Sequence, residues 1–582
     1  MPIDNPFQNY LKKLANLKYF INNVVIAMGY SGFWEWVNRF FIPITFLSSI
    51  ALGTIYFISD LPRWWLIILF LIYLGFVLFY PLQVYLSKIM DLKTHLFYFI
   101  TYITSLSTLQ ISRNLIFKRV SQAKKFGYIS ELAEKIVYFS KQWNLGFSKS
   151  IREVKKFVTY KPLADFFERL ATISDFGEDV ETFFLQEQDA LVNELVAEYN
   201  KTYEYIRMIQ EIFVSFIITF SFIMALFMIM PILTGNSMEG IIKILAVIVF
   251  TVDLILIVFV RLIIPKDDLI HDLPIVSDYA KKVHLSFMIS FPIAIALIIL
   301  FWFIFSDSLP FLLIIALGIT PLLVPAFMAD KLEKMIIEKD KAFPAFIRTF
   351  GGAIEARGGG VISAMEGLRI QDFGPLQEIF ERLYVRLKTG NDKYACWLYF
   401  GGESDSNLIY NFSQIFAETV YLGGNAEKIG EVISKNMQKI INLRQTKFQL
   451  VSSLRGALYG ALVGFATAGY IGIEVSSRLA NIFSLPLSMM QELGTDMFAN
   501  IVSEIPQIDV KTMFIYVGIM ILTHSFFSAY LLKILDGGHK FAMFFDLILM
   551  IWIGGILSWF IPVVLSQLLP GITATATSLF SF

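Results

Sequence analysis

The chain has 582 residues, of which 56% are hydrophobic and only 16% are charged, and its formal net charge is zero. Because a soluble domain has about 25% charged residues, this composition excludes an ordinary soluble domain and indicates a membrane protein with several spans. The single cysteine, Cys396, excludes an internal disulfide framework, and no Cys/His cluster suggests a metal site.

The first 36 residues mix lysines with short apolar runs and show no removable signal peptide. We expect residues 7–27 to form either an amphipathic helix on the membrane surface or an ordinary packed cytosolic helix. Two apolar stretches follow at 37–58 and 64–86, with a tight turn between them.

A membrane span needs about 20 apolar residues in a helix, and seven more stretches satisfy this. They lie at 211–233, 241–264, 286–306, 309–329, 456–475, 512–533 and 541–568. The segments 87–210 and 330–455 are too polar to span. The predicted fold is therefore all-α and polytopic, with nine transmembrane helices and two cytoplasmic helical modules, and with an outer segment at 476–511.

Basic residues orient this arrangement. With the N-terminus inside and the C-terminus outside, the only Lys and Arg residues on the outer side are Arg63, Lys243, Arg478 and Lys511. An excess of Lys and Arg on the inner side is the usual pattern for short cytoplasmic loops. The sequence therefore predicts that both polar segments face the cytoplasm.

The two polar segments contain a repeat. Residues 146–184 align without a gap on 359–397, with 11 of 39 positions identical, and the phrase PLADFFERL at 162–170 returns as PLQEIFERL at 375–383. Proline suits the first position of a helix, and the spacing of Leu163, Phe167 and Leu170 predicts a buried apolar stripe. Asp165–Arg169 and Glu378–Arg382 are expected to pair at i,i+4 on the wet face.

Glycines are expected to end these helices or to form the turns between them. We favour a core-building role over direct binding for the repeated phrase. The residues predicted to form the module cores and turns are Gly146, Pro162, Phe167, Leu170, Gly177, Gly359, Pro375, Phe380, Leu383, Gly390, Gly423 and Gly424. The second copy is richer in glycine turns and has one extra predicted helix at 407–421.

Polar residues inside predicted spans are costly and therefore notable. Asp253 and His524 lie at similar depths in the second span after each module, and we predict that they approach each other; separate satisfaction in a packed bundle is the alternative. Asp546 either joins them or reaches towards the inner surface. Small residues that allow close helix packing recur in one span: Gly456, Gly460, Gly464 and Gly472. We expect them to face either an internal helix or a second copy of the chain.

The chain lacks the motifs of an energy-converting enzyme. It has no GxxxxGK[ST] loop, no HExxH and no GxSxG, and its five histidines are not grouped. We therefore expect no catalytic residue, no metal and no cofactor, and any energy for its work must come from a partner.

The stretches at 343–368, 375–392 and 421–440 resemble the type II secretion F domain family, and the two-module arrangement is similar to the platform proteins of archaeal type IV filaments. The resemblance implies a platform in the cell membrane that couples a hexameric cytoplasmic secretion ATPase to the insertion of pilin-like subunits. Of the archaellum and the adhesion pilus, we favour the archaellum. A secondary transporter, whose repeats lie in the spans, and a membrane-bound enzyme or sensor are the alternatives.

The partners that the resemblance implies are the ATPase, pilin or archaellin subunits, membrane lipid and a possible second copy, with no nucleic acid. Two kinds of residue are candidates for the ATPase-facing surface. The acidic turns are the first: Glu178, Asp179 and Asp392. The basic helix is the second: Lys435, Lys439, Arg444 and Lys447. A further basic run, from Arg113 to Lys125, is also a candidate. For both basic groups, contact with anionic lipid is the stronger alternative, because basic residues near inner helix ends ordinarily meet it, so we prefer the acidic turns.

Overall fold

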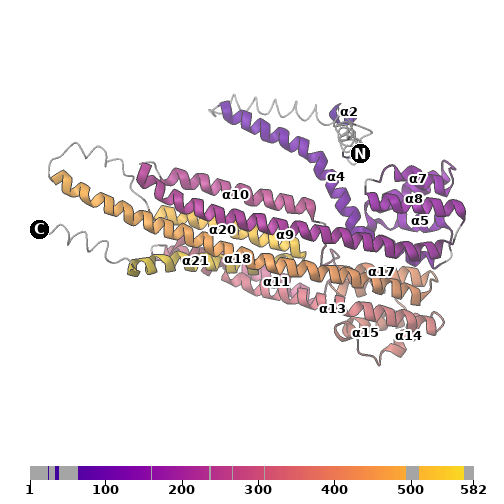
Figure 1. Ribbon diagram of the computed structural model, residues 1–582. Coiled ribbons are helices and arrows are strands. Elements are labelled where there is room, and N and C mark those ends of the chain that lie inside the picture. Colours follow the sequence, from indigo (N-terminus) through magenta and orange to yellow (C-terminus); the bar gives the residue numbers. More distant parts are fainter. Residues whose placement is uncertain are drawn as a thin grey trace, which may run out of the picture. The chain divides into compact units, whose positions relative to one another are not determined.

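The computed structural model describes residues 63–492 and 510–568, apart from 110, 159, 178, 235–237, 265–266 and 307, together with residue 24 and residues 33–38. All regular elements in this part are helical (Figure 1). This confirms the all-α fold class. The predicted N-terminal helix at 7–27 and the first span at 37–58 fall almost wholly outside the described residues.

The chain divides into two compact units, which we describe separately. The first comprises residues 1–196, 262–267 and 418–432, and the second comprises 197–261, 268–417 and 433–582.

The first unit contains the first repeat. Its helices include α2 (Phe33–Trp36), α4 (Arg63–Ser107), α5 (Arg113–Gln122), the 3-10 turn η2 (Lys124–Phe126), α6 (Tyr128–Lys141), α7 (Phe147–Lys155), α8 (Lys161–Phe176) and the start of α9 (Val180–Thr234). Aromatic rings form its core: Phe99 packs edge-on against Phe166 at 6.2 Å, and Phe117 packs against Phe167 at 6.5 Å between ring centroids. The second predicted span, 64–86, lies within the 45-residue helix α4.

The second unit holds the second repeat and most of the apolar helices. After the rest of α9 come α10 (Met238–Ile263), α11 (Asp278–Phe305), α12 (Phe311–Ile319), η3 (Thr320–Leu322) and α13 (Leu323–Ala356). The second repeat follows as α14 (Val361–Leu368), η4 (Gly374–Leu376), α15 (Gln377–Lys388), α16 (Lys393–Glu403) and α17 (Asn407–Tyr421). The chain then forms α18 (Ala426–Glu492), α20 (Val510–Asp536), η5 (Lys540–Ala542) and α21 (Met543–Leu568).

Among the described residues, seven helical segments are long and apolar enough to cross a membrane. Each of them overlaps one of the seven predicted spans between 211 and 568, which confirms a multi-pass membrane protein. One detail differs, because the span predicted as a single helix at 309–329 is interrupted by the 3-10 turn η3. Pro321 lies in that turn, and proline has no N–H to continue the α-helical hydrogen bonds.

The predicted outer segment at 476–511 begins as helix, since α18 continues to Glu492. Residues 493–509 of that segment lie outside the described part. The extra helix expected at 407–421 is α17.

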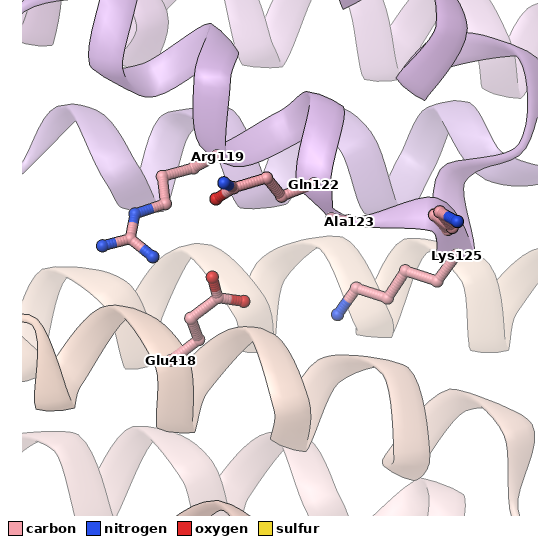
Figure 2. A pocket seen from close by; sticks show the side chains of 6 residues that line it. Arg119, Gln122, Ala123, Lys125 and Glu418 are labelled. Atoms are coloured by element: carbon pink, nitrogen blue, oxygen red, sulfur yellow. The ribbon is translucent and has the colours of Figure 1, made fainter. Parts of the chain in front are cut away.

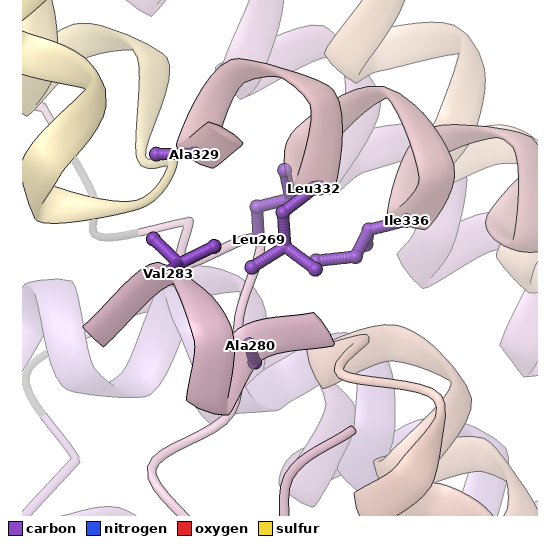
Figure 3. Close-up of a cluster of buried hydrophobic side chains, with 6 residues drawn as sticks. All are labelled: Leu269, Ala280, Val283, Ala329, Leu332 and Ile336. Carbon is purple, nitrogen blue, oxygen red and sulfur yellow. The ribbon is translucent and has the colours of Figure 1, made fainter. Parts of the chain in front are cut away.

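A small apolar core connects the chain between α10 and α11 to two neighbouring helices (Figure 3). Leu269 from this connector packs with Val283 of α11 and with Leu332 and Ile336 of α13, all of them almost fully buried. The burial of these aliphatic side chains fixes the connector, residues 268–277, against the base of the second module.

Candidate functional site

The repeated phrase builds the core of each module, as its apolar spacing predicts. Phe167 and Leu170 are buried in α8, and Phe380 and Leu383 are buried in α15. Pro162 lies in the first turn of α8. Pro375 differs from expectation: it lies in η4, one short turn before α15, because the chain enters this helix through the left-handed Gly374.

The predicted turn glycines adopt backbone conformations that other residues rarely tolerate. Gly146, Gly177, Gly359, Gly390 and Gly423 all have positive φ, which glycine reaches without a steric cost. Gly177 ends α8 in the left-handed conformation. Gly424 is restricted by space instead, since a Cβ there would meet Ile429 at 2.7 Å.

The charged residues of the phrase bind the helices of each module together. Glu168 contacts Arg152 at 3.3 Å and Lys155 at 2.9 Å, both on α7. Its counterpart Glu381 contacts Arg369, just after α14, at 3.1 Å. In both modules the glutamate thus connects the repeated helix to the helix before it.

Only one of the two predicted i,i+4 pairs forms. Arg382 pairs with Glu378, but Arg169 pairs with Glu187 of α9 instead of with Asp165. The tertiary contact is preferred because the first turns of α9 lie beside α8, which sequence spacing cannot indicate.

The acidic candidates for the ATPase-facing surface are exposed, and both described members cap helices. Asp179 accepts hydrogen bonds from the backbone N–H of Thr182 at 3.0 Å and from its hydroxyl at 2.6 Å. The Thr182 hydroxyl holds the pKa of Asp179 below its usual range. Asp392 caps α16 by accepting from the N–H of Tyr394 at 3.1 Å. Glu178 lies outside the described residues.

The basic candidates on α18 divide into two groups. Lys435 is exposed and Lys439 is half-buried, so both remain accessible. Arg444 and Lys447 are buried. The expectation that Arg444 faces a docking partner is therefore wrong, because its guanidinium is used inside the protein.

Arg444 forms a buried ion pair with Asp340 of α13. Their closest atoms, Nη1 and Oδ2, are 3.1 Å apart, and the two side chains are 5% and 4% exposed. The Ser406 hydroxyl donates to the other carboxylate oxygen of Asp340, and Arg444 also donates to the backbone carbonyl of Asp268 at 3.1 Å. We call Asp340, Ser406 and Arg444 the polar hub.

The connector is attached to the second module on both sides of the hub. His271 Nε2 lies 2.8 Å from the carbonyl of Gly402, and the N–H of Ser277 donates to Asp405 at 2.8 Å. The N–H of Asn407 donates to the carbonyl of Leu269 at 3.0 Å. A Cβ on Gly402 would meet Ile275 at 2.7 Å, so this contact requires glycine.

The structure brings Asp253 of α10 and His524 of α20 together within the membrane-spanning region. His524 Nδ1 is 3.1 Å from Asp253 Oδ2, and the two side chains are 0–1% exposed. On its other side, His524 Nε2 lies 3.4 Å from the hydroxyl of Ser528, and the ring of Phe213 stacks on the imidazole at 5.6 Å. Each polar atom of the histidine thus has a partner, which makes burial affordable.

Asp546 does not join this pair. It lies 3.0 Å from Arg455 Nε and accepts a hydrogen bond from Tyr459 at 3.0 Å, both on α18. Arg455 also contacts Asp536 at the end of α20. These contacts connect α18, α20 and α21.

The glycine stripe on α18 is partly open. A Cβ at Gly456, Gly460 or Gly464 would meet no heavy atom of the described residues within 4 Å, whereas Gly472 is buried. Nothing described within the chain therefore packs closely on its first three members.

Sequence reasoning missed Asp340 and Ser406 of the hub. A signal was present, because Asp340 occupies a position on the apolar stripe of α13, between Ile336 and Phe343. A charged residue on such a stripe indicates a buried partner.

Two curated relatives match the chain over nearly its whole length. The flagella accessory protein J of Methanocaldococcus jannaschii is 29% identical over 548 residues, which cover 92% of this chain and 96% of the relative. The flagella accessory protein J of Methanococcus voltae is 28% identical over 551 residues, with the same coverage. No protein-family model matches the chain, so its likeness to the type II secretion F domain rests on the quoted stretches, and no solved structure matches it. The full-length match confirms the resemblance that the repeated modules suggested: the chain is similar to flagella accessory protein J along nearly all of its length.

Proposed function

We propose that this protein is the membrane platform of an archaellum, and that it couples a cytoplasmic secretion ATPase to the insertion of pilin-like subunits into the filament. The family relationship supports the archaellum over an adhesion pilus, because both relatives carry a flagellar name. In this proposal the N-terminus and both modules lie inside, and the C-terminus lies outside.

The observation that carries the proposal is the continuity between modules and spans. α9 has 55 residues and α18 has 67, so at 1.5 Å per residue they extend about 80 and 100 Å. Each begins in a polar module and continues as an apolar segment fit to span the membrane. A movement of either module is therefore carried into the membrane by a helix rather than by a loop.

The polar hub adds a second route within the second unit. α13 enters the second module from an apolar segment, and α18 leaves the module towards another. The Asp340–Arg444 pair joins these two helices where they pass. A force that the cytoplasmic ATPase exerts on the module would thus act on both helices together.

The division of labour explains what the sequence lacks. No phosphate-binding loop for a nucleotide occurs in the chain, so the ATPase must be a separate subunit. Its docking surface would include the exposed charged residues of the module ends, with Asp179, Asp392 and Lys435 as candidates. The membrane-spanning part would guide the subunits.

Gene deletion with separate scoring of swimming and surface attachment tests this proposal. We expect loss of archaella and of swimming, with attachment retained, and restoration of both by the intact gene. Loss of attachment with normal swimming would assign the chain to an adhesion pilus instead. An Asp253→Asn variant that loses uptake of a solute while filaments still form would support a transporter.

A further inference from the structure

A hollow of about 330 Å³ opens at the end of α5 in the first unit (Figure 2). Arg119 comes from the last turn of α5, and Lys124 and Lys125 come from η2. Across from them stands one acid, Glu418 of α17. The full lining is Arg119, Gln122, Ala123, Lys124, Lys125 and Glu418.

The basic side chains of the hollow lack acidic partners. Among the described residues, no carboxylate oxygen lies within the 4.0 Å ion-pair distance of Arg119, Lys124 or Lys125. In the same unit, Arg152, Lys155 and Arg169 all form ion pairs. The hollow therefore has three basic side chains against one acid, an excess of positive charge within the part of the chain that the structure describes.

Glu418 is positioned by a tyrosine rather than by these cations. The Tyr102 hydroxyl donates to Glu418 Oε1 at 2.5 Å, which leaves Oε2 available. In Figure 2 the carboxylate points towards the gap between Arg119 and Lys125.

Burial disfavours the charge of the Lys125 ammonium, although two aromatic rings attract it. Its Nζ lies 5.7 Å from the ring centre of Tyr102 and 5.4 Å from that of Phe126. Burial lowers the pKa of Lys125 to about 8, against the opposing effect of Glu418. A bound anion would relieve this cost, because an opposite charge nearby favours the ammonium form.

We propose that this hollow binds a phosphate group that still carries a proton. The three basic side chains hold the charged oxygens, since Arg and Lys form the strong, charge-assisted hydrogen bonds that phosphate accepts. The free oxygen of Glu418 accepts the hydrogen bond of the P–OH. A carboxylate can accept but not donate, so a fully deprotonated anion such as sulfate is repelled at this point.

The lining determines how much of a ligand is recognised. Ala123 is the only non-polar residue in it, so the hollow offers little surface to a nucleobase or an acyl chain. Its volume is at the lower end of the range for ligand sites, about 300–1,000 Å³. The recognised group is thus the phosphate itself, either inorganic phosphate or the phosphate-monoester headgroup of a lipid. This site stands independently of the function proposed above.

Binding of radiolabelled inorganic phosphate to the full-length chain tests the proposal, in nanodiscs made of a phosphocholine lipid at neutral pH. We expect one phosphate per chain, and no displacement by excess sulfate at the same ionic strength. Arg119→Gln and Lys124→Gln should each weaken binding about tenfold or more, the value of one charge-assisted hydrogen bond. Lys124 is exposed, so its replacement does not disturb the core.

Two further variants separate a specific site from a basic surface. Glu418→Gln should abolish the preference for phosphate over sulfate, because an amide can donate to either anion. Lys118→Gln is the matched control, as Lys118 is an exposed lysine of α5 outside the hollow, and it should leave binding unchanged. Equal competition by sulfate in the unaltered protein, or equal weakening by Lys118→Gln, would overturn the proposal.

A lipid arm identifies the source. Nanodiscs containing a lipid with a phosphate-monoester headgroup should exclude soluble phosphate if the ligand comes from the membrane, and should leave phosphate binding unchanged if the ligand is soluble. Both results support the site. The absence of phosphate binding in discs both with and without this lipid, together with no protection of Lys125 from amine-reactive reagents, would refute it.

Discussion

Replacement of Arg444 by methionine should loosen the second module strongly. Methionine keeps much of the side-chain volume but removes the guanidinium that pairs with the buried Asp340 carboxylate, and the carbonyl of Asp268 loses a donor. Breaking a buried ion pair by removing one partner costs about 3–5 kcal/mol. Replacement of an exposed lysine by methionine would lower the free energy of unfolding by less than about 0.5 kcal/mol.

Cys396 provides a native probe for this effect. It is the only cysteine of the chain, it lies in α16 and it is 2% exposed. Burial raises the pKa of its thiol, so a thiol reagent reacts only after the module opens. α16 is held near the hub, since Lys339, next to Asp340, donates to the carbonyl of Ser404 at 3.1 Å. When reclosing outpaces labelling, a loss of about 3–5 kcal/mol speeds the reaction by roughly two to four orders of magnitude.

A double-mutant cycle isolates the ion pair. Asp340→Asn alone should also speed labelling greatly, because it removes the carboxylate that pairs with the buried Arg444 guanidinium. The double variant Asp340→Asn/Arg444→Met removes both charges of the pair, so it should be destabilised by only about 1–2 kcal/mol, less than either single variant. Lys435→Met, on the same helix but exposed, is the control and should label at the original rate.

Two results would refute this reasoning. If the effects of the two single variants added up in the double variant, the side chains would act independently. If Arg444→Met changed the labelling rate by less than about threefold, the pair would not hold the module closed at all.

Four other predictions follow from the structure. Phe167→Ala should destabilise the protein by about 3–5 kcal/mol in thermal unfolding, because it empties a buried core position, whereas Glu168→Gln, at half-exposed ion pairs, should cost less than about 1 kcal/mol. Asp253→Asn should preserve both the fold and swimming, since the amide can still bond its histidine partner, while Asp253→Leu should lower the unfolding temperature. Gly460→Ala should raise stability by about 0.5–1 kcal/mol, because alanine is the better helix former and no described atom obstructs its methyl group; a loss would reveal a helix packed there. The pKa of Lys125, near 8 in the folded protein against about 10.4 in the unfolded chain, predicts that stability rises between pH 8 and pH 10, and Lys125→Met should flatten that rise.

The sequence predicts the spans and the repeated cores because their signals are local. A run of about 20 apolar residues has few alternatives to a membrane helix, and the spacing around Phe167 and Phe380 places them on one buried stripe. Positive-φ turns at Gly177 and Gly390 are predictable for the same reason, since glycine after a helix has a specific steric role.

Contacts between distant segments were not predictable in the same way. Asp340 and Arg444 are 104 residues apart, and a basic residue near an inner helix end looks the same whether it faces lipid, a partner or a buried carboxylate. The approach of Asp253 and His524 could be predicted only because both residues are unusual inside apolar spans and lie at similar depth. The break at η3 and the placement of Pro375 depend on short-range turn geometry, which apolar periodicity does not report.

Each of the two modules has its own core, built from the same repeated phrase. They differ in how they are attached to the membrane-spanning helices. The first module passes into a predicted span through α9. The second is approached by α13, left by α18 and held by the connector, which also reaches the turn after α20 through the bond from Leu269 N–H to the Gly537 carbonyl at 2.9 Å. The polar hub joins α13 to α18 through the Asp340–Arg444 pair, and Arg444 also holds the connector through the carbonyl of Asp268. One of the extra glycine turns of the second module, at Gly402, lies at the base of that module, where its carbonyl contacts His271 of the connector. In the proposed platform, a force on the second module would be transmitted through the polar hub to α13 and α18 together.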